Sequence, residues 1–167
     1  MKQPSIVVVG SSNTDMIIQL DRIPKPGETI LGGTFTTAAG GKGANQAVGA
    51  ARAGGRVTFV ARVGQDMFGD QALAGFQKDG ICVDYVARDR KAPSGVALIF
   101  VARDGENSIA VAGGANGQLS PADVRKARVV LVPVTGFPVL QTQHPVHGAL
   151  DEDGHIEQRP DVSPHWI

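Results

Sequence analysis

Two short stretches of the sequence carry residue types that could bind a polar ligand. Asn13 and Asp15 follow the apolar run of residues 5–10, and the stretch AAGGKGANQAVGAARAGG at 38–55 places Lys42 inside a glycine-rich turn. A carboxylate can accept hydrogen bonds from two neighbouring hydroxyl groups, an amide can both donate and accept, and a lysine adds a cationic donor. These groups favour a neutral polyol over an anion, because Asp15 would repel a phosphate.

The glycine-rich turn does not match the common nucleotide-binding patterns. A P-loop needs Gly, four further residues and then Gly-Lys-Ser/Thr, but Thr36 occupies the first glycine position and Gly43 follows Lys42. The dinucleotide fingerprint also fails, since GSSNTD after the first strand lacks the second and third glycines. An unrelated nucleotide-binding domain is therefore disfavoured. The other open alternative is that Asp15 caps a turn and Lys42 is solvated.

The elements around these stretches indicate an α/β fold. Residues 5–10 and 57–64 are β-branched runs typical of buried strands, whereas the apolar spacing over 44–55 and 68–80 predicts two helices. Alternating strands and helices imply parallel strands with right-handed crossovers. Ligands of such sheets bind beyond the carboxyl ends of the strands, where helix N-termini also point. Both polar stretches are expected at that edge.

Residues 95–112 interrupt the alternation. GVALIFVA, RDGE and NSIAVA predict a β-hairpin with an Asp-Gly turn at 104–105, which is either an antiparallel sheet edge or a flap over a site. LSPADVRKA predicts a helix capped by Ser120. VVLVPV at 129–134 predicts a last buried strand.

The final stretch, residues 135–167, shows neither helical nor strand periodicity and is expected to be an irregular tail. His144, His147, His155 and Asp151 could in principle ligate zinc. Structural zinc sites usually include cysteine, and the tail contains none. We therefore expect solvated side chains here and no metal site.

Composition excludes several function classes. The sequence has 16 basic residues (Lys and Arg) and 16 acidic residues (Asp and Glu). The formal net charge is therefore zero, and no bulk charge attracts nucleic acid or a membrane surface. No stretch approaches the ~18 apolar residues of a membrane span, and the N-terminal apolar run is shorter than the ~7–15 residues of a signal peptide. The single cysteine, Cys82, excludes an internal disulfide. We expect a cytoplasmic protein without nucleic-acid or membrane partners.

Four stretches are distinctive in combination: VVVGSSNTDMIIQLDRIPKPGETILG, GGKGANQAVGAARAGG, VGQDMFGD and SGVALIFVARDGENSIAVAGGAN. Over about residues 4–132 the chain resembles the N-terminal half of ribokinase-like members of the phosphofructokinase-B (PfkB) family of carbohydrate kinases. The resemblance implies a ribokinase-like, Rossmann-like α/β fold: a partly parallel sheet with helices on both faces, plus a small β-lid. Residues 1–134 would form the N-terminal part of that domain, with the lid built from about 14–37 and 95–112.

The resemblance also implies a substrate site. In the family the first strand and the glycine loop hold the sugar, here ribose or a similar small sugar, with deoxyribose, fructose and nucleosides as open alternatives. Lid residues Ala97 and Ile99 would face the sugar or a second subunit, which implies a homodimer through the lid. The implied substrate-binding residues are Asn13, Thr14, Asp15, Gly41, Lys42, Gly43, Ala44 and Asn45.

The C-terminal half of the family fold is expected to be absent. The family uses an Asn-x-x-Glu segment for magnesium and phosphate and a Gly-Ala-Gly-Asp turn with the general-base aspartate, and such positioning supplies most of phosphoryl-transfer catalysis. Neither pattern occurs in this sequence. The full-length family implies ATP, Mg²⁺ and K⁺; this chain is expected to bind them poorly, to contain no catalytic residue and to be inactive alone. The alternative is a sugar-binding or dimerising interaction module without catalysis.

Overall fold

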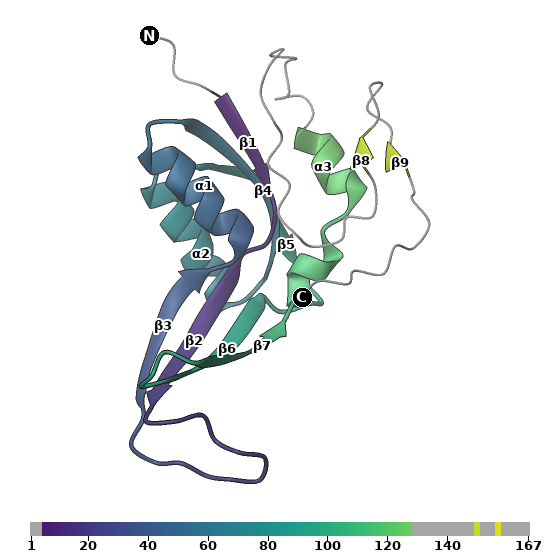
Figure 1. The fold of residues 1–167 in the computed structure, drawn as a ribbon. Helices are drawn as coiled ribbons and strands as arrows, with labels where there is room; N and C mark the ends of the chain where they lie inside the picture. Colours follow the sequence, from purple (N-terminus) through teal and green to yellow (C-terminus); the bar gives the residue numbers. More distant parts are fainter. Residues whose placement is uncertain (1–4, 128–148, 151–155, 158–167) are drawn as a thin grey trace.

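The computed structural model describes residues 5–127, 149–150 and 156–157. Two sheets dominate the described chain, one parallel and covered by helices, the other mixed and extending away from the first (Figure 1). Two further short strands, β8 (Ala149–Leu150) and β9 (Ile156–Glu157), pair antiparallel. The strand predicted at 129–134 and the histidines of the predicted tail lie outside the described residues.

The parallel sheet has three strands in the order β1–β4–β5, and both neighbours run parallel to β4. Helices α1 and α2 cover one face, whereas α3 and the short 3-10 helix η1 lie on the other (Figure 1). β4 is therefore buried along nearly its whole length. The elements are β1 (Ser5–Val9), β4 (Arg56–Gly64), β5 (Cys82–Asp89), α1 (Lys42–Arg52), α2 (Met67–Lys78), η1 (Gly114–Gln118) and α3 (Pro121–Ala127).

The predicted strands and helices of this layer are confirmed, as are the parallel pairing and the helices on both faces. β5 has no counterpart in the sequence-based prediction. Its sequence, CVDYVARD, interleaves charged and apolar residues, because the strand lies at one edge of the sheet and is only partly covered. A fully buried run is the pattern that predicts a parallel strand, and β5 does not have it.

The second sheet has four strands in the order β3–β2–β6–β7 and is called the lid below. β2 runs antiparallel to β3 and parallel to β6. β6 and β7 are antiparallel, which confirms the predicted hairpin and makes β7 an edge strand. The strands are β2 (Asn13–Leu20), β3 (Thr34–Gly40), β6 (Gly95–Ala102) and β7 (Asn107–Ala112).

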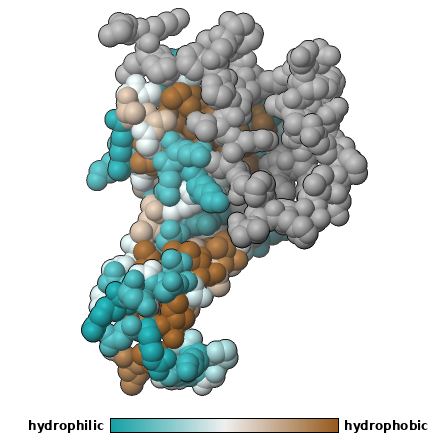
Figure 2. Space-filling model, in the orientation of Figure 1, coloured by the Kyte–Doolittle hydropathy of each residue, from teal (hydrophilic) through white to brown (hydrophobic). Residues whose placement is uncertain are grey.

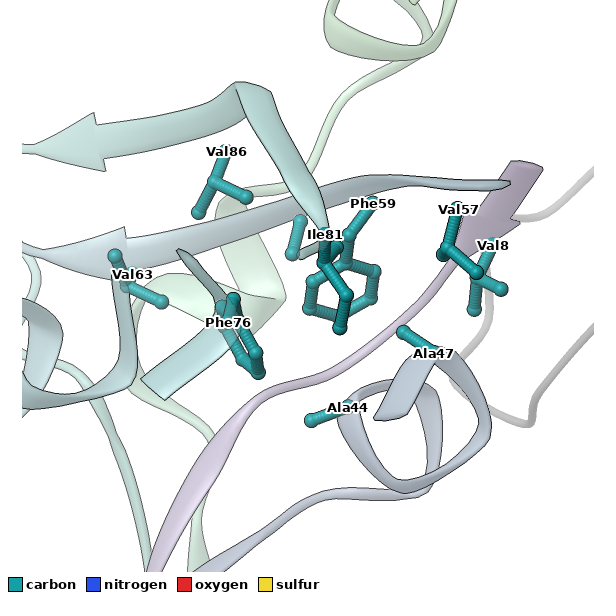
Figure 3. Close-up of a cluster of buried hydrophobic side chains, with 10 residues drawn as sticks. Val8, Ala44, Ala47, Val57, Phe59, Val63, Phe76, Ile81 and Val86 are labelled. Carbon is teal, nitrogen blue, oxygen red and sulfur yellow. The ribbon is translucent and has the colours of Figure 1, made fainter. Parts of the chain in front are cut away.

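The main hydrophobic core lies between the parallel sheet and helices α1 and α2 (Figure 3). It contains an aromatic pair, Phe59 of β4 and Phe76 of α2, whose ring centroids are 5.0 Å apart with an edge-to-face angle of 79°. Such pairs contribute about 0.5–1.5 kcal/mol beyond the burial of their area. The other buried members are Val8, Ala44, Ala47, Val57, Ala61, Val63, Ile81 and Val86.

A charged network holds α3 and η1 against the opposite face. The guanidinium of Arg62 lies 2.9 Å from the Asp89 carboxylate and 2.8 Å from that of Asp123, and it donates to the Gln118 carbonyl at 3.2 Å. Asp123 and Ser120 also exchange side-chain-to-backbone hydrogen bonds in both directions. This reciprocal pair confirms Ser120 as the cap of α3. Burial would raise the pKa of Asp123, but the bonds from Ser120 and the charge of Arg62 hold it below its usual value.

Phe76→Ala tests the core. Because Phe76 is 4 % exposed and packs on Phe59, we expect a loss of about 3–5 kcal/mol in the free energy of unfolding. Chemical denaturation of the 167-residue chain measures it. Phe35→Ala, at a 60 % exposed position of the lid, is the matched control and should change stability by about 0.5 kcal/mol or less. Equal losses in the two variants would contradict this core.

Arg62→Met tests the charged network. Near neutral pH it removes the guanidinium from Asp89 and Asp123, with Lys126 still 3.9 Å from Asp123. We expect a loss of about 3 kcal/mol, the lower end for breaking a buried pair, because Arg62 is 25 % exposed. Since the pKa of Asp123 is lowered from 3.8 on folding, its contribution is present above that value and is lost as the pH falls below it. The variant should therefore lose less stability on acidification than the wild type.

The control is Arg103→Met. Its ion pair with Asp21 is exposed on both sides, and such pairs contribute about 0–1 kcal/mol. Denaturation curves across the acid range compare the three proteins. An Arg62→Met curve parallel to that of the wild type at every pH would contradict the role of the network.

Candidate functional site

The glycine loop, residues 40–43, packs directly against the backbone between β1 and β2. Gly41 has a φ of +95°, which favours glycine, and a Cβ there would lie 2.7 Å from the Ser11 carbonyl oxygen. A Cβ on Gly43 would lie 2.7 Å from the Cα of Gly10. Both positions therefore require glycine, because two backbone segments meet without room for a side chain.

Hydrogen bonds hold the loop in this place. The Ala44 N–H donates to the Ser11 carbonyl at 2.9 Å, and the Asn45 N–H donates to the Gly41 carbonyl at 2.9 Å to begin α1. The side chain of Ala44 is 3 % exposed and packs in the core, so Ala44 anchors the loop. The side chains of Lys42 and Asn45 are exposed. The structure thus brings together the two polar stretches that the sequence analysis singled out.

Asp15 of β2 lies at the centre of this region. It pairs with Ala38 of β3 on one side and Ala97 of β6 on the other. A Cβ on Gly40 would overlap its carboxylate, so the carboxylate lies against the start of the glycine loop. Burial raises the pKa of Asp15, and no residue in the described ranges forms a hydrogen bond or ion pair with the carboxylate. Its acceptor oxygens are available to a ligand.

Strand register decides which lid residues share a face with Asp15. Asp15 is level with Ala97, and Ile17 is level with Ile99, so these four side chains project to one face of the lid. Thr14 alternates with Asp15 and projects to the other face. Only its backbone lies with the predicted site. The face of Asp15 is completed by Ile109 and Val111 of β7, which the alternation of NSIAVA would have indicated.

Asn116 of η1 also belongs to this region, and the sequence analysis does not assign it. It is 8 % exposed. Its side chain accepts from the Ser12 N–H at 2.9 Å and donates to the Ser12 carbonyl at 3.0 Å and to Oδ1 of Asn13 at 2.8 Å. The string GGAN offers no local sign of a contact to residues more than a hundred positions away.

A second network joins the parallel sheet to the lid. Asp66 caps α2 by accepting from the Gly69 N–H at 2.9 Å, and it accepts from the backbone and hydroxyl of Ser94 at 2.8 and 2.7 Å. The Ser94 hydroxyl in turn accepts from the Gly64 N–H at 3.0 Å. Burial would raise the pKa of Asp66, but these hydrogen bonds hold it below its usual value. Because Ser94 directly precedes β6, the network fixes the base of the lid.

Neither a P-loop nor a cluster of metal-ligating side chains is found among the described residues. Over 5–127 and the two short paired strands, no group of three or more His, Cys, Asp or Glu side chains could hold a metal. The glycine loop does not follow the P-loop pattern, and the tail histidines lie outside the described part.

Among the described helices, none combines the length and the apolar character that a bilayer crossing requires.

Comparison with known proteins places these features in one family. The family described as "pfkB family carbohydrate kinase" matches residues 3–145. The chain is 45% identical over 118 residues to a ribokinase of Bacillus subtilis (strain 168). This alignment covers 71% of this chain and 40% of the relative. It is 41% identical over 127 residues to a ribokinase of Mus musculus, covering 76% of this chain and 39% of the relative. The chain thus spans about 40% of the length of these relatives.

Solved structures agree with this placement. The ribokinase of Giardia lamblia superposes with a TM-score of 0.71 at 38% identity, over 79% of this chain and 40% of that one. The ribokinase of Arabidopsis thaliana, solved in complex with ribose and ATP, superposes with a TM-score of 0.61 at 43% identity, over 69% of this chain and 38% of that one. The fold is the expected ribokinase-like α/β fold, and the chain belongs to the pfkB family of carbohydrate kinases.

Proposed function

We propose that this chain is the sugar-binding half of a carbohydrate kinase that uses ATP to phosphorylate ribose or a closely similar sugar. The observation that carries the proposal is the half-buried carboxylate of Asp15, which lies where the glycine loop meets the lid and has no partner within the described residues. Neighbouring sugar hydroxyls would supply the hydrogen bonds that it lacks. The similarity to ribokinases, one of them solved with ribose and ATP, supports the choice of sugar.

The remaining groups would complete a polyol site. Asn13 supplies an amide beside Asp15, whereas Lys42 and Asn45 supply exposed polar groups at the start of α1. Gly41 and Gly43 keep the loop backbone free of side chains, so that a ligand can approach it closely.

The lid would supply the apolar part of the site. Ala97 and Ile99 would place an apolar surface over the carbon face of the sugar. Thr14 and Ala44 would act through their backbones.

Phosphoryl transfer is not expected from this chain alone. In its 167 residues, none of the asparagines is followed three positions later by glutamate, and no Gly-x-Gly-Asp occurs. Binding of ATP, Mg²⁺ and K⁺ is therefore assigned to the part of the relatives that the chain does not span. The single cysteine supports a reducing compartment such as the cytoplasm.

A second candidate function is a dimerising sugar-binding module without catalysis. The lid exposes large apolar side chains on both faces. Brown patches lie over the lower part of the view in Figure 2. Phe35 and Leu98, 60% and 48% exposed, lie on the face opposite Asp15, whereas Ile109 and Val111, 54% and 55% exposed, lie on the face of Asp15. Exposed apolar patches mark interaction surfaces. One face would cover the sugar and the other a second copy of the chain.

Asp15→Asn tests the sugar site. Hydrogen bonds to a charged group contribute about 1.5–3 kcal/mol, so we expect ribose affinity, measured by calorimetry, to fall by at least about 10-fold. Asp84→Asn is the matched control at an exposed position of β5, and it should bind ribose like the wild type. Equal affinity for ribose in the Asp15 variant, or no ribose binding by the wild type, would contradict the proposal.

The same variant separates function from stability. Burial raises the pKa of Asp15 above 3.8, so the ionised carboxylate opposes folding at neutral pH, and this cost disappears as the pH falls below the folded pKa. Asp15→Asn should therefore be at least as stable as the wild type near pH 7. The two proteins should converge in strong acid. A variant less stable than the wild type at neutral pH would show that Asp15 has a structural partner.

A turnover assay distinguishes the two candidate functions from an autonomous kinase. The purified chain is mixed with ribose, ATP, Mg²⁺ and K⁺, and ADP is measured with and without the sugar. We expect no sugar-dependent ADP, because the general-base and phosphate-binding segments of the family are not in this sequence. Sugar-dependent ADP formation would contradict the assignment of catalysis to another part of the relatives.

A further inference from the structure

Asn116 is a buried polar side chain whose hydrogen-bonding capacity is nearly filled by one short segment of chain. From η1 it reaches the connection between β1 and β2 and makes three hydrogen bonds to Ser12 and Asn13. A Cβ on Gly95 would overlap both Nδ2 of Asn116 and Oδ1 of Asn13. The absence of a side chain at the start of β6 therefore leaves the space in which the two amides meet.

The backbone of Ser12 fixes which way the Asn116 amide points. A backbone N–H can only donate, and a backbone carbonyl can only accept. Oδ1 of Asn116 must therefore face the Ser12 N–H, and Nδ2 must face the Ser12 carbonyl, as observed at 2.9 and 3.0 Å. The reversed amide would place two donors together and two acceptors together, which is costly at a buried site.

This orientation dictates the orientation of the Asn13 amide in turn. The second hydrogen of the Asn116 Nδ2 points at Asn13, so Asn13 must present its acceptor, Oδ1, at 2.8 Å. The Nδ2 group of Asn13 takes no part in this contact. Within residues 5–127 no group accepts a hydrogen bond from that Nδ2. Asn13 is thereby set as a donor toward any ligand beside it.

We propose that Asn116 is a positioning residue that makes Asn13 a hydrogen-bond donor in the sugar site, opposite in polarity to the acceptor Asp15. The inference rests on the proposed function of that site. Asn13 and Asp15 are two positions apart on one strand, so their side chains project to the same face. Neighbouring hydroxyls can accept from Asn13 and donate to Asp15, a pairing that a deoxygenated position cannot make.

Asn116→Asp tests whether Asn116 sets the orientation of the Asn13 amide. The introduced carboxylate still accepts from the Ser12 N–H, but its second oxygen faces two acceptors, the Ser12 carbonyl and Oδ1 of Asn13. The backbone carbonyl is fixed, whereas the side chain of Asn13 can turn. The Asn13 amide then rotates to donate to that oxygen and presents Oδ1 to the sugar. We expect ribose affinity to fall about 10- to 100-fold, as for a hydrogen bond replaced by an unmatched group. Asn107→Asp, the same change at an exposed position of β7, should bind ribose like the wild type.

A double-mutant cycle separates positioning from general damage. Asn13→Ala should lower ribose affinity in the wild-type background and produce little further loss in the Asn116→Asp background, because there the Asn13 amide is already misdirected. Independent, additive losses would overturn the proposal. Asn116→Ala is the alternative variant if Asn116→Asp does not fold. It should lower ribose affinity and leave the Asn13 amide mobile.

The wild-type protein provides a readout that needs neither sugar nor variant. In the free chain, NMR should show the side-chain hydrogens of Asn116 protected from exchange with water and those of Asn13 exchanging rapidly. Protected Asn13 hydrogens in the free chain would overturn the proposal, because its amide would then have the opposite orientation. Absence of ribose binding would overturn the proposed function alone, whereas this exchange pattern decides the orientation by itself.

Discussion

The glycine loop and the connection between β1 and β2 meet backbone to backbone, and the position of α1 follows from this contact. The glycine loop reaches the connection between β1 and β2 at distances that leave no space for a Cβ at Gly41 or Gly43. This contact starts α1 against the end of the parallel sheet, from where Ala44 and Ala47 reach the core. The pairing of β2 with β3 places Asp15 beside Gly40, at the start of the same loop.

Two networks of hydrogen bonds connect the parallel sheet and its helices to the base of the lid. Asp66 holds Ser94, the residue that precedes β6, by two hydrogen bonds. Asn116 holds Ser12, the residue that precedes β2, in the same way. The lid therefore joins the rest of the molecule through buried, well-satisfied hydrogen bonds, whereas its own strands expose large apolar side chains. Satisfied buried networks specify one arrangement. A lid fixed at its base and apolar on both faces is suited to covering a ligand on one side and a partner on the other.

Local sequence patterns predicted the elements that depend on local chemistry. The apolar spacing over residues 44–55 predicts α1, the Asp-Gly turn predicts the β6–β7 hairpin, and the cap of Ser120 predicts α3. β5 was not predictable in this way, because an edge strand with charged residues lacks the alternation or the apolar run on which such predictions rest. The sequence also singled out the glycine loop and the pair Asn13 and Asp15, which the structure brings together.

Local residue patterns are enough to indicate the residue types of the candidate site, the family pattern that contains them and most of the helices and strands. The arrangement of the candidate residues in space depends on tertiary contacts. Strand register turned Thr14 away from Asp15, and core packing took up the side chain of Ala44. Asn116 meets Ser12 across 104 positions of the sequence. Periodicity and capping act within a few residues, whereas burial and hydrogen-bond polarity depend on segments that meet only after the chain has folded.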